Sequence, residues 1–224
     1  TVKRIVPYSP GKSSAEVMRE LGIEKVTKLA SNENPIGPSP RVVEALGAAA
    51  SEAHIYPDPE CVELSAALGT HLGVDPAQVV IGRGSDEIIH LLGLAFLGEG
   101  DNIVFASPYF TLYPYTAQLM GAEERAVPHR EFRHDLEAMA DVIDEHTRLL
   151  FICNPYNPTG TIVTADEVER LMVRVPDTCI VVFDEAYVEY VRDPQFPDAL
   201  AYVRADRRCA VLRTFSKVYA LAGL

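Results

Sequence analysis

The sequence predicts an α/β fold in which a mostly parallel β-sheet lies between layers of helices. Two observations favour it: short runs of apolar residues recur along the chain, and segments with helical periodicity separate them. A strand that is apolar along its whole length is typical of a parallel sheet with both faces covered. With 224 residues, 48% of them hydrophobic, the chain is long enough to bury such a sheet.

The first 40 residues differ from the rest because they are rich in Pro, Gly, Ser and Asn, and they predict an extended arm with a short helix at 14–21. We therefore expect an N-terminal arm at 1–40 and one large domain at 41–224. In the large domain, helices are expected at 41–51, 59–72, 85–97, 112–121, 165–175 and 198–203, and strands at 79–81, 103–106, 149–153, 179–183 and 209–212.

Composition narrows the class of protein. The net charge of −12 is spread along the chain and disfavours a nucleic-acid partner. No apolar run approaches the roughly 18 residues of a membrane span, and no signal sequence is apparent, so a cytoplasmic protein is expected. Cys153 and Cys179 are interpreted as buried free thiols, and His129 and His134 as a solvated loop pair rather than a metal site.

Ligands of an open parallel sheet bind beyond the carboxyl ends of its strands, so the residues after each predicted strand are the candidates for chemistry. After 79–81, Gly84 is followed by Ser85 and Asp86 as helix caps, which predicts either a phosphate site or a plain helix start. Glu87 replaces the last glycine of the dinucleotide fingerprint, and Val6 replaces the first glycine of a Walker loop, so both nucleotide motifs fail.

The other predicted strands are also followed by distinctive strings. Aromatic residues at 107–113 suit a flat ring or simple core packing, and the turn at 154–160 with two Asn-Pro pairs suits aiming an amide side chain. Asp184 is either a functional carboxylate or a structural partner. Lys217 follows hydroxyl residues and precedes an apolar stretch, which is unusual for a solvated surface lysine.

Together these strings resemble the fold-type I pyridoxal-phosphate aminotransferases and, among them, the histidinol-phosphate aminotransferase family. The resemblance covers nearly the whole chain in order. It includes the strings at 7–12, 29–35, 56–58, 84–87, 157–160, 184–187 and 214–217.

The resemblance implies pyridoxal 5′-phosphate as the cofactor. Lys217 would hold it as a Schiff base and move a proton, and Asp184 would pair with its pyridine nitrogen. Asn157 and Tyr187 would hydrogen-bond its phenolic oxygen, and Phe110 would stack on its ring, although Tyr109 competes for that place. The catalytic residues would be Lys217, Asp184 and Tyr187.

The family also implies how the cofactor phosphate and the substrate are held. The phosphate would contact the backbone around Gly84, Ser85 and Asp86 and the hydroxyls of Thr214 and Ser216. Tyr56 would reach the phosphate of the neighbouring subunit, which implies a homodimer. Tyr8, Asn32, Glu33 and Asn34 match the arm that closes over the substrate.

The implied reaction transfers an amino group between L-histidinol phosphate and 2-oxoglutarate in histidine biosynthesis. The alternatives are an aromatic amino-acid aminotransferase, a threonine-phosphate decarboxylase or a non-catalytic fragment that binds the cofactor. Beyond the positions that match Gly223 and Leu224, the family continues with a phosphate-binding arginine and a small C-terminal domain that carries a substrate-binding arginine, and we expect this chain to lack both. Weak cofactor binding and no turnover are therefore expected of this chain alone.

Overall fold

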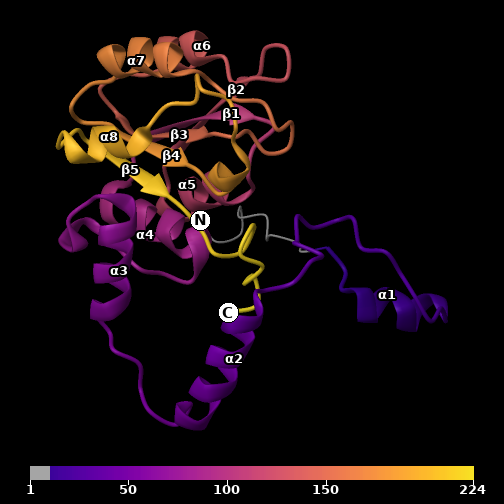
Figure 1. Cartoon of the computed structure of the whole chain (residues 1–224). Helices are drawn as coiled ribbons and strands as arrows, with labels where there is room; N and C mark the ends of the chain where they lie inside the picture. The colour runs from indigo at the N-terminus through magenta and orange to yellow at the C-terminus, as the bar shows by residue number, and fades with distance from the viewer. Residues whose placement is uncertain (1–10) are drawn as a thin grey trace.

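The computed structural model describes residues 11–224, and its centre is a parallel sheet, as predicted. The described residues form a five-stranded sheet in the order β2-β1-β3-β4-β5, and every neighbouring pair is parallel (Figure 1). The strands are β1 (Asn102–Ser107), β2 (Glu123–Pro128), β3 (Thr147–Cys153), β4 (Ile180–Asp184) and β5 (Cys209–Leu212). The sheet confirms the predicted α/β fold.

Helices α4 to α8 cover the two faces of this sheet. The helices are α1 (Ser14–Leu21), α2 (Pro40–Ala49), α3 (Val62–Leu72), α4 (Gly84–Phe96), α5 (Leu112–Met120), α6 (Leu136–Asp141), α7 (Ala165–Arg174) and α8 (Ala199–Arg204), with short 3-10 turns η2 (Ala50–Glu52), η3 (Pro76–Gln78) and η4 (Val188–Tyr190). One core cluster joins alternate strand residues to α6, α7 and α8. The other joins the remaining strand residues to α4 and α5. Both faces are thus buried, which explains why the strands are apolar throughout.

The prediction was wrong at one strand and missed another. The segment 79–81 is not a strand, and Val80 is 70% exposed. Strand β2 was missed because its charged residues resemble a surface segment. It lies at the edge of the sheet, and Val127 is its buried residue. Charge on an edge strand is common, because it discourages pairing with another chain.

The N-terminal segment stands apart from the sheet. Helices α1 and α2 extend away from it (Figure 1), and neither contains a buried residue in the described chain. Both begin where serine side chains, Ser13 and Ser39, accept hydrogen bonds from the first turn. Within residues 11–224, the longest and most apolar helices still fall short of what crossing a bilayer requires.

Candidate active site

The sequence-predicted site residues follow the carboxyl ends of neighbouring strands. The backbone register pairs Cys153 of β3 with Asp184 of β4, and Asp184 with Leu212 of β5. Since the strands are parallel, the segments that lead to Asn157 and Lys217 begin at the same end of the sheet as Asp184, where the carboxyl ends of the strands lie. The topology therefore gathers residues that lie far apart in sequence.

Lys217 lies close to two acidic residues and one tyrosine of this edge. Its Nζ atom is 5.7 Å from the centre of the Tyr187 ring. Its positive charge also lowers the pKa of both Asp86 and Asp184, opposing the larger effect of burial on each. The backbone register and the tyrosine contact place Lys217 at the same end of the sheet as the buried carboxylate.

Asp184 is a buried carboxylate with two hydrogen-bond donors. It is 4% exposed. Tyr113 donates its hydroxyl to Oδ2 at 2.5 Å, and the Ala186 amide donates to Oδ1 at 3.3 Å. Burial raises the pKa of Asp184, while these hydrogen bonds and the charge of Lys217 oppose that shift. A carboxylate in such a place favours a cationic partner.

The start of helix α4 supplies backbone amides beside Lys217. The helix begins at Gly84, whose φ of +70° is left-handed, and Ser85 and Asp86 follow in its first turn. The predicted capping by Ser85 and Asp86 is wrong, because neither side chain caps the helix. Glu87 instead accepts a hydrogen bond from the Arg83 amide at 2.6 Å. First-turn amides have no partner within their own helix and suit an anion.

The hydroxyls after β5 are arranged next to Lys217. Thr214 is 8% exposed and donates its hydroxyl to Ser216 Oγ at 2.9 Å. The Ser216 amide donates back to Thr214 Oγ1 at 3.1 Å. This compact turn orders the segment that carries Lys217. It also places two hydroxyls near the base of the site.

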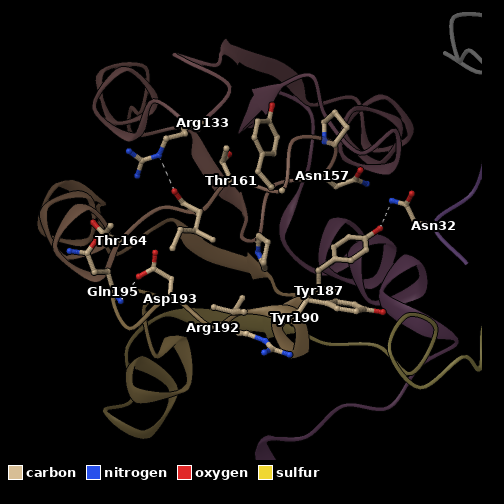
Figure 2. Close-up of a pocket in the computed structure, with 16 residues that line it drawn as sticks. Asn32, Arg133, Asn157, Thr161, Thr164, Tyr187, Tyr190, Arg192, Asp193 and Gln195 are labelled. Carbon is tan, nitrogen blue, oxygen red and sulfur yellow. Dashed lines mark hydrogen bonds between the residues drawn. The ribbon is translucent and has the colours of Figure 1, made fainter. Parts of the chain in front are cut away.

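Two asparagines of the arm reach the same region from the other end of the chain. Asn32 donates to the hydroxyl of Tyr187 at 2.8 Å (Figure 2). Asn34 donates to the Val218 carbonyl at 2.9 Å. Glu33 lies between them but pairs with Lys28 at 2.5 Å. The structure therefore brings Asn32 and Asn34 to the site and directs Glu33 to another arm residue.

The remaining arm and loop candidates lie elsewhere. Tyr8 falls outside the described residues. Tyr56 lies between η2 and α3 and is 97% exposed. Its ring therefore belongs to the surface of this chain rather than to the cluster around Lys217.

The turn after β3 uses its two asparagines differently. Asn154 is buried, and its side chain exchanges hydrogen bonds with the backbone of Val163 at 3.0 and 3.3 Å. It is therefore a structural residue of the turn. Asn157 is partly exposed, and its amide extends in Figure 2 towards the same side as the Tyr187 hydroxyl. The rigid turn thus presents Asn157 to the site.

A cavity of about 730 Å³ adjoins this cluster. Asn32, Asn157 and Tyr187 line its inner end, and it extends past the turn at 160–164 towards Arg192 (Figure 2). Lys217 and Asp184 are not part of its lining. The cavity therefore marks the space in front of Tyr187 rather than the position of the amine and the buried carboxylate.

The two aromatic candidates after β1 have different surroundings. Phe110 is partly buried and meets Tyr113 edge to face, with ring centres 5.9 Å apart. Tyr109 is 42% exposed and contacts Phe105 in the same way at 5.0 Å. Phe110 is thus connected through Tyr113 to Asp184, which places it nearer to the buried carboxylate network.

The sequence analysis missed two features at this end of the sheet. Tyr113 was noted as one aromatic in a string, without its link to Asp184. Glu185, 1% exposed, receives two hydrogen bonds from Arg213 at 2.8 and 3.0 Å, and this ion pair ties β4 to the segment of Lys217. Acidic and basic residues next to the strand ends were the available signal for it.

A correction is needed for a histidine. His134 was expected in solvent, but it is 8% exposed and packs edge to face on Tyr156. Within residues 11–224, neither of its ring nitrogens finds a hydrogen-bond partner. The buried states expected of Cys153 and Cys179 are confirmed, at 5% and 1% exposure.

Comparison with known proteins identifies the family. The family model for aminotransferase class I and II matches residues 24–224. The chain belongs to this aminotransferase family. Among curated relatives, the histidinol-phosphate aminotransferase of Moorella thermoacetica is 51% identical over 98% of this chain and 57% of its own length. That of Caldicellulosiruptor saccharolyticus is 46% identical over 100% of this chain and 62% of its own length. The resemblance predicted from the motifs is confirmed.

Solved structures agree on the fold. Histidinol-phosphate aminotransferase from Sinorhizobium meliloti, solved in complex with pyridoxal-5′-phosphate, matches with a TM-score of 0.87 at 30% identity, covering 96% of this chain and 58% of that one. L-threonine-O-3-phosphate decarboxylase from Porphyromonas gingivalis matches with a TM-score of 0.72 at 20% identity, covering 87% and 56%, which bears on the fold alone. The chain spans about three fifths of the length of these relatives.

Proposed function

We propose that this chain is the cofactor-binding part of a pyridoxal-phosphate aminotransferase that moves an amino group between L-histidinol phosphate and 2-oxoglutarate, a step of histidine biosynthesis. The observation that carries the proposal is the buried carboxylate of Asp184 at the end of β4, next to the end of β5 from which the segment of Lys217 continues. The names of the relatives support the substrate.

The groups at this edge fit pyridoxal phosphate. Lys217 offers an amine for its aldehyde carbon, and Asp184 offers a carboxylate for its ring nitrogen. Its phosphate suits the first-turn amides of α4 at Gly84, Ser85 and Asp86 and the hydroxyls of Thr214 and Ser216. Asn157 and Tyr187 suit its phenolic oxygen, and Phe110 suits the face of its ring.

Asp184, Lys217 and Tyr187 would each have a different role in the reaction. When bound, pyridoxal phosphate supplies a conjugated ring that accepts electrons from the Cα atom of the substrate. Asp184 would hold a proton on the ring nitrogen, which would favour that acceptance. Lys217 Nζ would accept the proton from the substrate Cα. Tyr187, fixed by Asn32 at 2.8 Å, orients its hydroxyl towards the site.

The arm and a second subunit complete this proposal. Residues 1–40 form the arm, with Tyr8, Asn32, Glu33 and Asn34 over the substrate, and residues 41–224 form the cofactor-binding domain. Tyr56 serves the site of the partner in a homodimer. Its 97% exposure, and that of Ile36 at 90%, support a surface that another chain covers.

A cofactor-binding experiment tests the core of the proposal. Pyridoxal phosphate added to the protein should give a visible absorption band, and borohydride should fix the cofactor on Lys217, as peptide mass spectrometry would show. Lys217→Ala should lose the band and, in the full-length protein, lower turnover by about 10⁴-fold, the upper end for one positioned acid–base group. Lys25→Ala, on the exposed arm, is the matched control. An unchanged band in Lys217→Ala would exclude the assigned role.

Turnover assays separate the substrates. The full-length protein should convert L-histidinol phosphate with a higher kcat/KM than phenylalanine, and it should release no carbon dioxide from threonine phosphate. Preference for phenylalanine would favour an aromatic aminotransferase, and carbon dioxide release would favour a decarboxylase. Absence of turnover on all three, with the cofactor bound to Lys217, would favour a non-catalytic protein.

Assembly and location have their own tests. Sedimentation should give twice the mass of one full-length chain, and a mixture of Lys217→Ala and Tyr56→Phe chains should regain activity if Tyr56 serves the partner. A monomer would contradict the homodimer. We also propose a cytoplasmic location, supported by the four cysteines, which are all free thiols. Recovery in a membrane or secreted fraction would contradict it.

A further inference from the structure

Among the residues that the structure describes, each oxygen of the Asp184 carboxylate has one hydrogen-bond donor. Tyr113 donates to Oδ2 at 2.5 Å and the Ala186 amide donates to Oδ1 at 3.3 Å. Each carboxylate oxygen accepts more than one hydrogen bond, so both retain capacity for a further donor. The Tyr113 contact is short, as expected when a hydroxyl donates to an ionised oxygen.

Packing fixes Tyr113 in this role. It is 2% exposed in the first turn of α5, and its ring stacks on Phe151 with centres 4.3 Å apart and planes 18° apart. Its amide donates to the Phe110 carbonyl at 3.1 Å, and its ring meets the Phe110 ring edge to face. The hydroxyl therefore stays on Asp184 rather than turning to water.

The charges around Asp184 explain why this hydroxyl matters. Burial raises the pKa of Asp184 and favours the neutral acid, while the hydrogen bond from Tyr113 favours the ionised form. Burial also raises the pKa of Tyr113 well above its usual value, so it remains a protonated donor. The nearby Cys153 thiol, whose pKa burial raises to about 12, stays neutral. Lys217 and Asp86 are the charged neighbours, of opposite sign.

We propose that Tyr113 is a positioning residue that keeps Asp184 ionised, and thereby keeps the proton on the ring nitrogen of the cofactor rather than on the carboxylate. The inference rests on the proposed function. A proton between a ring nitrogen and a carboxylate can reside on either partner. The donated hydrogen bond lowers the proton affinity of the carboxylate, and so favours the charged ring. Losing a hydrogen bond to a charged group shifts such a balance by about tenfold or more.

Tyr113→Phe is the test, because it keeps the ring and its packing and removes the hydroxyl. The full-length variant would be loaded with pyridoxal phosphate labelled with ¹⁵N at the ring nitrogen, whose NMR shift differs strongly between protonated and unprotonated rings. We expect the resonance to move from the wild-type position towards that of Asp184→Asn. Tyr115→Phe, on the same helix, is the matched control and should keep the wild-type resonance.

The outcomes are distinct. Cofactor fixed on Lys217 with an unchanged ¹⁵N resonance in Tyr113→Phe would overturn this inference and leave the proposed function standing. Failure of the wild type to bind the cofactor at Lys217 would overturn both. If Tyr113→Phe does not fold, the loaded wild type should show a downfield hydroxyl-proton resonance that Asp184→Asn lacks. Its absence in the wild type would equally overturn the role of Tyr113.

Discussion

The sheet domain and the N-terminal segment are built in opposite ways. In residues 84–224, both faces of the sheet are buried under helices, and strands β3 and β4 are buried almost throughout. In residues 11–83, α1 and α2 contain no buried residue, and those of α3 are Ser65 and Gly69. Both regions contain apolar side chains, but in the described chain only the first covers them. The difference indicates that the sheet domain carries its own stability, whereas the N-terminal segment depends on a further surface.

Core truncation should give the largest contrast. Leu150 of β3 is 0% exposed, so Leu150→Ala should cost about 2–5 kcal/mol of unfolding free energy through lost burial and a cavity. Leu46→Ala in α2, where the side chain is 39% exposed, should cost about 0.5 kcal/mol in the isolated chain. Urea unfolding measures both. Equal losses would mean that α2 is packed as tightly as the sheet.

Breaking an ion pair should give the second-largest difference in stability loss between the two regions. Arg213→Met leaves Glu185, 1% exposed, without its counter-charge and should cost about 2–3 kcal/mol. Lys28→Met breaks the more exposed pair with Glu33 and should cost at most about 1 kcal/mol. Thermal unfolding at low and high salt compares them, and only the Lys28 effect should fade with salt. If the stability loss of Arg213→Met also decreased with salt, the Arg213–Glu185 pair would have to be exposed to solvent.

Replacing a glycine by alanine should change the stability in opposite directions in the two regions. A Cβ at Gly93 in α4 would lie 2.1 Å from Thr116 of α5, which is 1% exposed, so Gly93→Ala should destabilise by about 1–2 kcal/mol. A Cβ at Gly47 in α2 meets nothing within 4 Å in the described chain. Gly47→Ala should therefore stabilise by about 0.5–1 kcal/mol, through helix propensity. Denaturation midpoints check the signs, and stabilisation at both sites would contradict close packing of α4 on α5.

Acid sensitivity should give the smallest contrast. Burial lowers the pKa of His134 to about 3 from its usual 6.5. Between these values the unfolded chain binds more protons, so the contribution is complete above pH 6.5 and is lost as the pH falls. From pH 6 to pH 5 it should remove about 1 kcal/mol of stability, and His134→Phe should abolish this loss. His54→Gln, in the exposed N-terminal segment, should leave this loss of stability as in the wild type. Identical pH slopes for wild type and His134→Phe would contradict the burial of His134.

The sequence predicted what depends on local pattern. The four strands that form the centre and one edge were predicted because they are apolar. Asp184 and Lys217 were chosen as site candidates because each lies in a distinctive string. Strand β2 was missed because Glu123, Glu124 and Arg125, which pair with β1, interrupt the apolar pattern by which the other strands were recognised. The role of Tyr113 was missed because its partner is 71 residues away, and such contacts follow from register and topology rather than from local pattern.

Strand β5 has a consequence for how the protein is made. It follows β4 in sequence and, in the part of the chain that the structure describes, pairs with β4, so the nascent chain makes β4 before the strand that covers this side of it. Until residues 209–212 leave the ribosome, the backbone edge of Val181, Val182 and Phe183 is unpaired. At about 5–20 residues per second, that interval lasts seconds. Such an edge is a template for misassociation, so slow codons between 185 and 208 should lower the yield of folded protein.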